Sequence, residues 1–165
     1  MENKKLDLTV DPVQLTADLV DVYSESHHEQ KLGDLLEPAL RAIENVQVVR
    51  RGNTLVARTD RGLGDRIVLA GHIDTVPPAD NVPSRRGPDP KTGEDTIFGL
   101  GSVDMKSGAA CYAQAFATLA NSPQLTRDMT LVLYEGEEVA TEYNGLNHLV
   151  NSDPDLLEGK LALLG

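Results

Sequence analysis

The sequence predicts an α/β fold in which a mixed, mostly parallel sheet is sandwiched by helices. Two unbroken apolar runs, at residues 66–71 and 129–134, are typical of strands that are covered on both faces. Helical patterns with an apolar face or a high alanine content lie at residues 12–23, 32–43 and 105–120. The alternation of these helices with the buried strands is what predicts the sandwich.

The composition is globular, with 40% hydrophobic and 25% charged residues among 165. This length fits one domain or part of a larger one. Fifteen basic and 26 acidic residues give a formal net charge of −11. The charge argues against nucleic-acid binding and against docking on an anionic membrane, because both need clustered Lys and Arg. With neither a transmembrane run nor a signal-peptide segment, we expect a soluble, cytoplasmic protein.

The first helix has a clear start signal in the sequence. Asp11 is the expected N-cap, Pro12 occupies the first helical position and Gln14 would close a capping box. The apolar side chains that follow are spaced to share one face, namely Leu15, Leu19, Val22 and Tyr23. The helix over residues 32–43 has the same character, with Leu32, Leu35, Leu36, Leu40 and Ile43 facing inward.

Shorter elements fill the rest of the chain. Residues 46–51 and 54–58 are predicted to form a hairpin around Gly52-Asn53. Five of the nine prolines lie within residues 75–102, which predicts a long functional loop with one short strand near residues 96–98. A helix should begin near residue 144. The last residues, 160–165, look like another central strand, and we therefore expect the chain to be truncated.

Three polar clusters have the residue types of a chemical site. The first is His72 and Asp74, directly after the strand at residues 66–71. Ligands of open α/β sheets bind at the carboxyl ends of strands, and this spacing lets the carboxylate reach the second imidazole nitrogen. The alternative is a histidine that closes a strand end beside a turn-forming aspartate.

The second cluster is the sequence GLGSVDMKSG, which contains Asp104. A phosphate cradle is disfavoured, because the third glycine of a dinucleotide fingerprint is missing and a carboxylate would repel a pyrophosphate. Asp104 would serve either as a helix N-cap or as a ligand beside glycines that let the backbone approach closely.

The third cluster is Glu135-Gly136-Glu137-Glu138, directly after the strand at residues 129–134. Alone, it would be interpreted as a solvated acidic turn. Together the clusters supply one imidazole and several carboxylates, a ligand set that suits Zn²⁺ or a similar divalent ion. Cys111 is the only cysteine, which excludes a zinc site made of cysteines alone.

The sequences GHIDTVP, GLGSVDMKSG and YEGEEVA, in this order, resemble the three N-terminal motifs of the M20 dinuclear zinc amidohydrolases. The residues of the second motif, and the sequence GPDPKTGEDTIFGLG before it, are most similar to the actinobacterial succinyl-diaminopimelate desuccinylases of that family. The resemblance implies a zinc-exopeptidase-like catalytic domain and two zinc ions, with cobalt as a possible substitute.

The resemblance also implies a role for each matching residue. His72 would bind the first zinc ion, and Asp74 would hold its imidazole. Asp104 would bridge both ions and would be followed by a cis peptide bond. Glu137 would be the general base, and Glu138 would bind the second ion.

Two ligands of the family pattern have no counterpart in this sequence. They are an acid shortly after the strand at residues 160–165 and a histidine far downstream, and His148 does not fit the histidine motif. His27 and His28 are expected to face solvent. The lid and dimerisation domain of the family is also absent. Residues 1–165 are therefore expected to be the N-terminal part of the catalytic domain, and the complete enzyme a homodimer through the missing domain.

The resemblance implies hydrolysis of N-succinyl-LL-2,6-diaminopimelate, a small-molecule substrate, to succinate and LL-2,6-diaminopimelate in lysine biosynthesis. Other family activities stay open, namely those of acetylornithine deacetylase, aminoacylase and carboxypeptidase. Outside the enzyme class, the chain would be a non-catalytic metal-binding fragment or a solvated acidic domain.

With only two ligands for each ion, one of them shared, the fragment alone should bind zinc weakly and be inactive. Without ions, Asp104, Glu137 and Glu138 would crowd one cleft, so at least one should have a raised pKa. The apolar strand at residues 160–165 should favour self-association.

Overall fold

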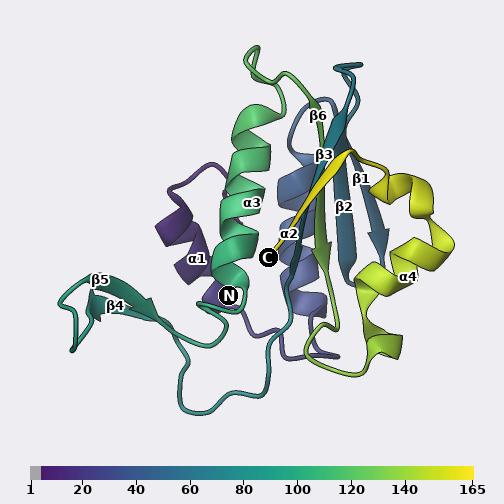
Figure 1. The fold of residues 1–165 in the computed structure, drawn as a ribbon. Coiled ribbons are helices and arrows are strands. Elements are labelled where there is room, and N and C mark those ends of the chain that lie inside the picture. Colours follow the sequence, from purple (N-terminus) through teal and green to yellow (C-terminus); the bar gives the residue numbers. More distant parts are fainter. Residues whose placement is uncertain (1–4) are drawn as a thin grey trace.

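A computed structural model describes residues 5–165 (Figure 1). The helices are α1 (Pro12–Val20), α2 (Gln30–Arg41), α3 (Lys106–Leu119) and α4 (Gly145–Ser152), with short 3₁₀ turns at Thr141–Tyr143 and Pro154–Leu157. The strands are β1 (Val46–Arg51), β2 (Thr54–Thr59), β3 (Arg66–His72), β4 (Arg85–Pro88), β5 (Asp95–Phe98), β6 (Asp128–Tyr134) and β7 (Leu161–Leu164). Within the described part of the chain, no helix is long and apolar enough to span a bilayer.

Five strands form one mixed sheet in the order β1-β2-β6-β3-β7. β1 pairs antiparallel with β2, and β2 pairs antiparallel with β6. β3 pairs parallel with both β6 and β7. The predicted mixed sheet is confirmed, and the parallel pair β3–β6 brings two strand ends with polar residues to the same edge.

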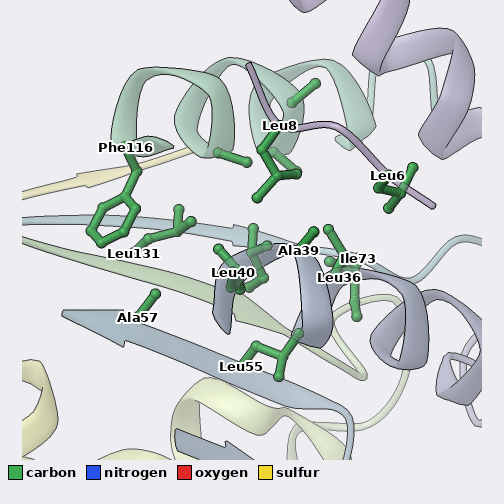
Figure 2. Packing of buried hydrophobic residues seen from close by; sticks show 14 of the residues in the cluster. Leu6, Leu8, Leu36, Ala39, Leu40, Leu55, Ala57, Ile73, Phe116 and Leu131 are labelled. Carbon is green, nitrogen blue, oxygen red and sulfur yellow. The ribbon is translucent and has the colours of Figure 1, made fainter. Parts of the chain in front are cut away.

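Helices cover both faces of this sheet, as the sequence predicts. Alternate side chains of a strand point to opposite faces. Leu55, Ala57 and Leu131 therefore join the core on the side of α1, α2 and α3, together with Phe116 (Figure 2). Val56, Val68, Ala70, Val132 and Tyr134 form a second cluster with Leu149 of α4 on the other side.

Helix α1 begins where the sequence predicts, because the Asp11 side chain accepts a hydrogen bond of 2.8 Å from the Val13 amide. The predicted capping box is wrong, since the Gln14 amide group donates to Asp18 at 3.4 Å instead of reaching back to the cap. The inward orientation of Tyr23 is also wrong. The helix ends at Val20, so helical spacing no longer applies, and Tyr23 is 46% exposed.

The long segment after β3 contains two strands where the sequence predicts one. β4 pairs antiparallel with β5, and Figure 1 shows this hairpin projecting away from the rest of the molecule. The side chains of Arg86 and Asp95 form an ion pair across it. The segment returns to the domain through Leu100, whose amide donates to the Asn81 carbonyl oxygen at 2.9 Å.

The strand predicted near the end of the chain is present as β7, but it lies at the edge of the sheet and not in its middle. Every residue of β7 is exposed, including Leu161 at 52% and Leu164 at 65%. Within residues 5–165 this apolar strand therefore pairs with β3 on one side only, and its leucine side chains stay about half exposed.

Candidate metal centre

The parallel register of β3 and β6 places two of the polar clusters side by side. His72, the last residue of β3, is opposite Tyr134, the last residue of β6. The amide of Ile73 continues the pairing by donating to the Tyr134 carbonyl oxygen at 2.8 Å. Residues that follow β3 and residues that follow β6 must therefore lie close together, as the rule for strand ends predicts.

His72 is buried between two aspartates. Its Nε2 lies 2.9 Å from Oδ1 of Asp104, and its Nδ1 lies 3.2 Å from Oδ1 of Asp74. Burial alone would lower the pKa of His72, but the hydrogen bonds to Asp74 and Asp104 outweigh it and raise the pKa to about 9. Without a metal ion, the imidazole is therefore held as a cation by the two carboxylates.

Asp74 is fully buried and serves two parts of the site at once. Its Oδ1 accepts from the Glu137 amide at 3.1 Å, and its Oδ2 accepts from the Glu138 amide at 3.1 Å and the Ser26 hydroxyl at 2.7 Å. Burial alone would raise the pKa of Asp74, but the hydrogen bonds from His72, Ser26 and these amides lower it to about 2. Asp74 is therefore ionised and fixed.

Asp104 reaches the same place from the segment that precedes α3. Its side chain is 73% exposed, and the peptide bond between Asp104 and Met105 is cis, as the resemblance implies. The alternative of Asp104 as an N-cap is wrong, because Met105 holds that position. The flanking glycines pack against the chain itself: a Cβ atom on Gly101 would lie 2.8 Å from Thr75, and one on Gly108 would lie 2.9 Å from Met105.

Glu137 and Glu138 complete the cluster from the turn after β6. Oε2 of Glu137 lies 4.0 Å from Nε2 of His72, and the Glu137 side chain is 43% exposed. Burial and the negative charge of Asp104 raise the pKa of Glu138 above its usual value. The prediction that at least one of these crowded carboxyl groups has a raised pKa is therefore confirmed.

Three of these residues form a group that suits a metal ion. One ligand atom each from His72, Asp104 and Glu138 lie within 4.8 Å of one another. One imidazole nitrogen and two carboxylate oxygens are ligand types that Zn²⁺ accepts in proteins. The buried carboxylate of Asp74 on the far side of the imidazole would fix its orientation toward the ion. The residues present therefore fit a divalent metal.

The other histidines lie outside this group. His148 is on α4, with its Nε2 2.6 Å from the Glu142 carbonyl oxygen. His27 and His28 are exposed, as predicted, and His27 packs edge-on against Tyr143.

Two residues that contact the site were missed by sequence reasoning. Ser26 donates to Asp74, and Oε1 of Glu29 accepts from the Gly136 amide at 3.2 Å. Both belong to a polar stretch that resembles a solvated helix start. The only signal in the sequence was that Glu29 precedes a helix without being a residue that N-caps favour.

Comparison with known proteins gives the affiliation of the chain. Residues 68–163 match the model of peptidase family M20/M25/M40. A succinyl-diaminopimelate desuccinylase of Corynebacterium glutamicum is 50% identical over 162 residues, which are 97% of this chain and 42% of the relative. The chain thus spans about two fifths of the length of that curated relative.

Solved structures agree on the fold. A tripeptidase from Staphylococcus aureus superposes with a TM-score of 0.70 at 20% identity, covering 94% of this chain and 43% of that one. An M20 family metallo-carboxypeptidase from Sulfolobus solfataricus gives 0.71 at 16% identity, covering 94% and 37%. The family model covers more than half of the residues, and it includes all five of the predicted site residues. This chain therefore belongs to peptidase family M20/M25/M40.

Proposed function

We propose that the protein containing this chain hydrolyses N-succinyl-LL-2,6-diaminopimelate to succinate and LL-2,6-diaminopimelate, a step of lysine biosynthesis. The observation that carries this proposal is the 50% identity with a succinyl-diaminopimelate desuccinylase over 97% of the chain. The grouping of His72, Asp104 and Glu138 supports metal-dependent hydrolysis independently of that identity.

In this proposal two zinc ions are bound, and cobalt is a substitute for them. His72 would hold the first ion, Glu138 would hold the second, and Asp104 would be shared by both. When bound, the ions supply Lewis-acid polarisation of the amide carbonyl and lower the pKa of the attacking water. Asp74 keeps the imidazole of His72 in place through the contact at Nδ1.

Glu137 is the proposed general base. Its carboxylate takes a proton from the attacking water as the oxygen bonds to the amide carbon. It then gives the proton to the amine nitrogen as the carbon–nitrogen bond breaks. The Glu137 side chain suits this role, because it is partly exposed and therefore accessible to substrate, and because it lies 4.0 Å from the imidazole of His72.

We further propose that residues 1–165 are the N-terminal part of the catalytic domain of a cytoplasmic enzyme that is a homodimer through its lid domain. In the proposed assignment each of the two ions would have two protein ligands from this chain, with Asp104 shared, whereas catalytic zinc sites normally have three. The fragment alone should therefore bind zinc weakly and show no turnover.

The test compares purified residues 1–165 with the complete protein, each assayed with added zinc. The substrates are N-succinyl-diaminopimelate, N-acetylornithine, N-acyl amino acids and dipeptides. We expect turnover only by the complete protein, with the highest kcat/KM for the succinyl substrate. A higher kcat/KM for another substrate would assign another activity of the family. Turnover by the fragment at a comparable rate would refute the proposed ligand count.

A further inference from the structure

The turn that carries Glu137 and Glu138 directs three consecutive backbone amides at two buried carboxyl groups. The Glu137 and Glu138 amides donate to the two oxygens of Asp74, each at 3.1 Å. The preceding amide, that of Gly136, donates to Oε1 of Glu29 at 3.2 Å. Successive amides in a turn form a concave site for anions, and here the chain itself supplies two carboxyl groups as acceptors.

Burying the carboxyl group of Glu29 at this position costs free energy. It is the N-cap residue of α2, yet its side chain makes no capping hydrogen bond, and it is only 1% exposed. Its second oxygen, Oε2, is buried and makes no hydrogen bond of good geometry with the described residues. An apolar side chain would fill this space without the cost of desolvating a carboxyl group. The carboxyl group interacts with the backbone of His27 and of Glu29 itself, and the Gly136 amide is the contact by which it reaches the turn after β6.

Gly136 has little freedom to take another orientation. Its φ is +70°, and a Cβ atom at this position would collide with the carbonyl group of Tyr143. The backbone around residue 143 therefore confines the turn on one side, and on the other side the Gly136 amide donates to Glu29. A shift of Gly136 would displace the next two residues, which carry the proposed base and a proposed ligand.

We propose that Glu29 is a positioning residue, which by accepting the Gly136 amide fixes the turn that directs Glu137 and Glu138 toward His72 and Asp104. The expected effect on turnover rests on the proposed function. The expected effects on the turn and on zinc affinity rest only on the geometry of the site.

The experiment uses two substitutions of Glu29 in the complete protein. Glu29→Gln keeps an oxygen that accepts the Gly136 amide, whereas Glu29→Met fills a similar volume without an acceptor. Leu32→Val is the matched control, because Leu32 is a fully buried core residue of the same helix. Hydrogen exchange of the peptide spanning residues 134–140 reports on the turn. Competition with a chelator gives the zinc affinity, and kinetics give kcat and KM.

In Glu29→Met we expect exchange of this peptide to be about tenfold faster or more, and zinc affinity to fall about 10–100-fold, the usual range for residues that orient metal ligands. The kcat should fall while KM stays near its original value. Glu29→Gln should restore all of these readouts. Leu32→Val should lower the Tm and leave exchange at the turn and zinc affinity unchanged.

Several outcomes would overturn the proposal. One is a Glu29→Met protein whose turn exchanges at the wild-type rate and whose zinc affinity stays within about twofold of the wild-type value. A twofold change is well below the usual effect of residues that orient metal ligands. Another is a Glu29→Gln protein as impaired as Glu29→Met. If Glu29→Met fails to fold, Glu29→Asp replaces it, because a side chain one methylene shorter withdraws the acceptor. If the wild-type protein does not cleave the succinyl substrate, the proposed function fails while exchange and zinc affinity still decide the role of Glu29.

Discussion

Two buried aspartates at opposite ends of the sheet make nearly the same hydrogen bonds but hold loops that carry different side chains. Asp128, the first residue of β6, accepts from the Thr59 hydroxyl at 2.7 Å and from the amides of Arg61 and Leu63 at 2.9 Å. Asp74, just after β3, likewise accepts from one hydroxyl and two amides. Each carboxylate thus ties a loop to the end of a strand.

The difference lies in what the bonded loop carries. The amides that bond Asp128 belong to a connection without a cluster of ligating side chains. The amides that bond Asp74 belong to Glu137 and Glu138, and Asp74 also faces the imidazole of His72. The hydrogen bonds alone therefore do not reveal a functional aspartate, whereas the chemistry of the residues it holds does.

The largest expected effect comes from removing the carboxylate that is proposed to bridge both ions. Asp104→Ala in the complete protein should deplete both metal positions, because one carboxylate contributes to both. Metal analysis by mass spectrometry after dialysis measures this directly. One ion still bound at full stoichiometry would contradict the bridging role and weaken the contrast between the two ends of the sheet.

The next largest effect should be on rate without loss of metal. Glu137→Gln should keep its zinc and lower kcat by about 10²–10⁴-fold, the usual range for loss of a general acid–base group. Steady-state kinetics and zinc content, measured on the same preparation, test this. If Glu137→Gln loses zinc while Glu138→Gln keeps it, the roles of the two residues are reversed.

Asp74→Asn tests whether Asp74, unlike Asp128, affects metal binding. The amide keeps one acceptor oxygen for the turn but removes the charge that faces His72, so zinc affinity should fall about 10–100-fold. Chelator competition measures the change. An unaltered affinity would mean that Asp74 acts, like Asp128, only on the fold.

Asp128→Asn is the counterpart at the other end. Burial alone would raise the pKa of Asp128, but the amides of Arg61 and Leu63 and the hydroxyl of Thr59 hold the pKa below its usual value. The substitution should lower the free energy of unfolding by about 1–3 kcal/mol, because it disturbs a buried, hydrogen-bonded charge. Zinc affinity should not change. Urea unfolding measures the first quantity and chelator competition the second.

The smallest effect concerns pH in the absence of metal. The pKa of His72 is raised from 6.5 to about 9, so its contribution to stability is complete below about pH 6.5 and is lost as pH rises through about 9. We expect a loss on the order of 1 kcal/mol, because Asp104 is exposed and water screens its charge. Urea unfolding at pH 6 and pH 9.5 measures it. His148→Gln should keep this pH dependence. The difference between the wild type and His72→Gln isolates the contribution of His72, because Lys106, whose pKa burial lowers to about 8, contributes with the opposite sign.

The sequence predicts the parts of the fold in which local pattern and burial agree. The apolar runs identify β3 and β6, and the capping signal at Asp11 identifies the start of α1. In each case residues that are neighbours in the sequence are enough to determine the element. β4 escapes prediction because Arg-Arg-Gly-Pro has no apolar alternation, and its strand geometry comes from pairing with β5. Tyr23 is misplaced because periodicity says nothing beyond the residue at which a helix ends.

At the site, the sequence identifies the residues that carry recognisable motifs and misses those that support them. Four of the five predicted site residues directly follow a buried strand, and the fifth precedes a helix, so their proximity is predictable from topology. They are His72, Asp74, Glu137 and Glu138 after the strands, and Asp104 before the helix. Glu29 lies between two exposed histidines and a glutamine, and a neighbouring polar run gives no sign of burial. Its contact with Gly136 spans 107 residues of sequence, and only the tertiary fold creates it.

The pairing of β3 with β6 in register also sets where the chain can change in length. Side chains alternate between faces, so one residue inserted into β3 would turn the later side chains of that strand, His72 included, to the opposite face, and one inserted into β6 would do the same to Tyr134. The β4–β5 hairpin lies outside this constraint, because the amide of Leu100 bonds the Asn81 carbonyl oxygen and closes the segment at its base. Insertions and deletions at the hairpin tip should leave the distance from Asp104 to His72 unchanged. Length variation should therefore concentrate there, and β3 and β6 should keep a constant number of residues.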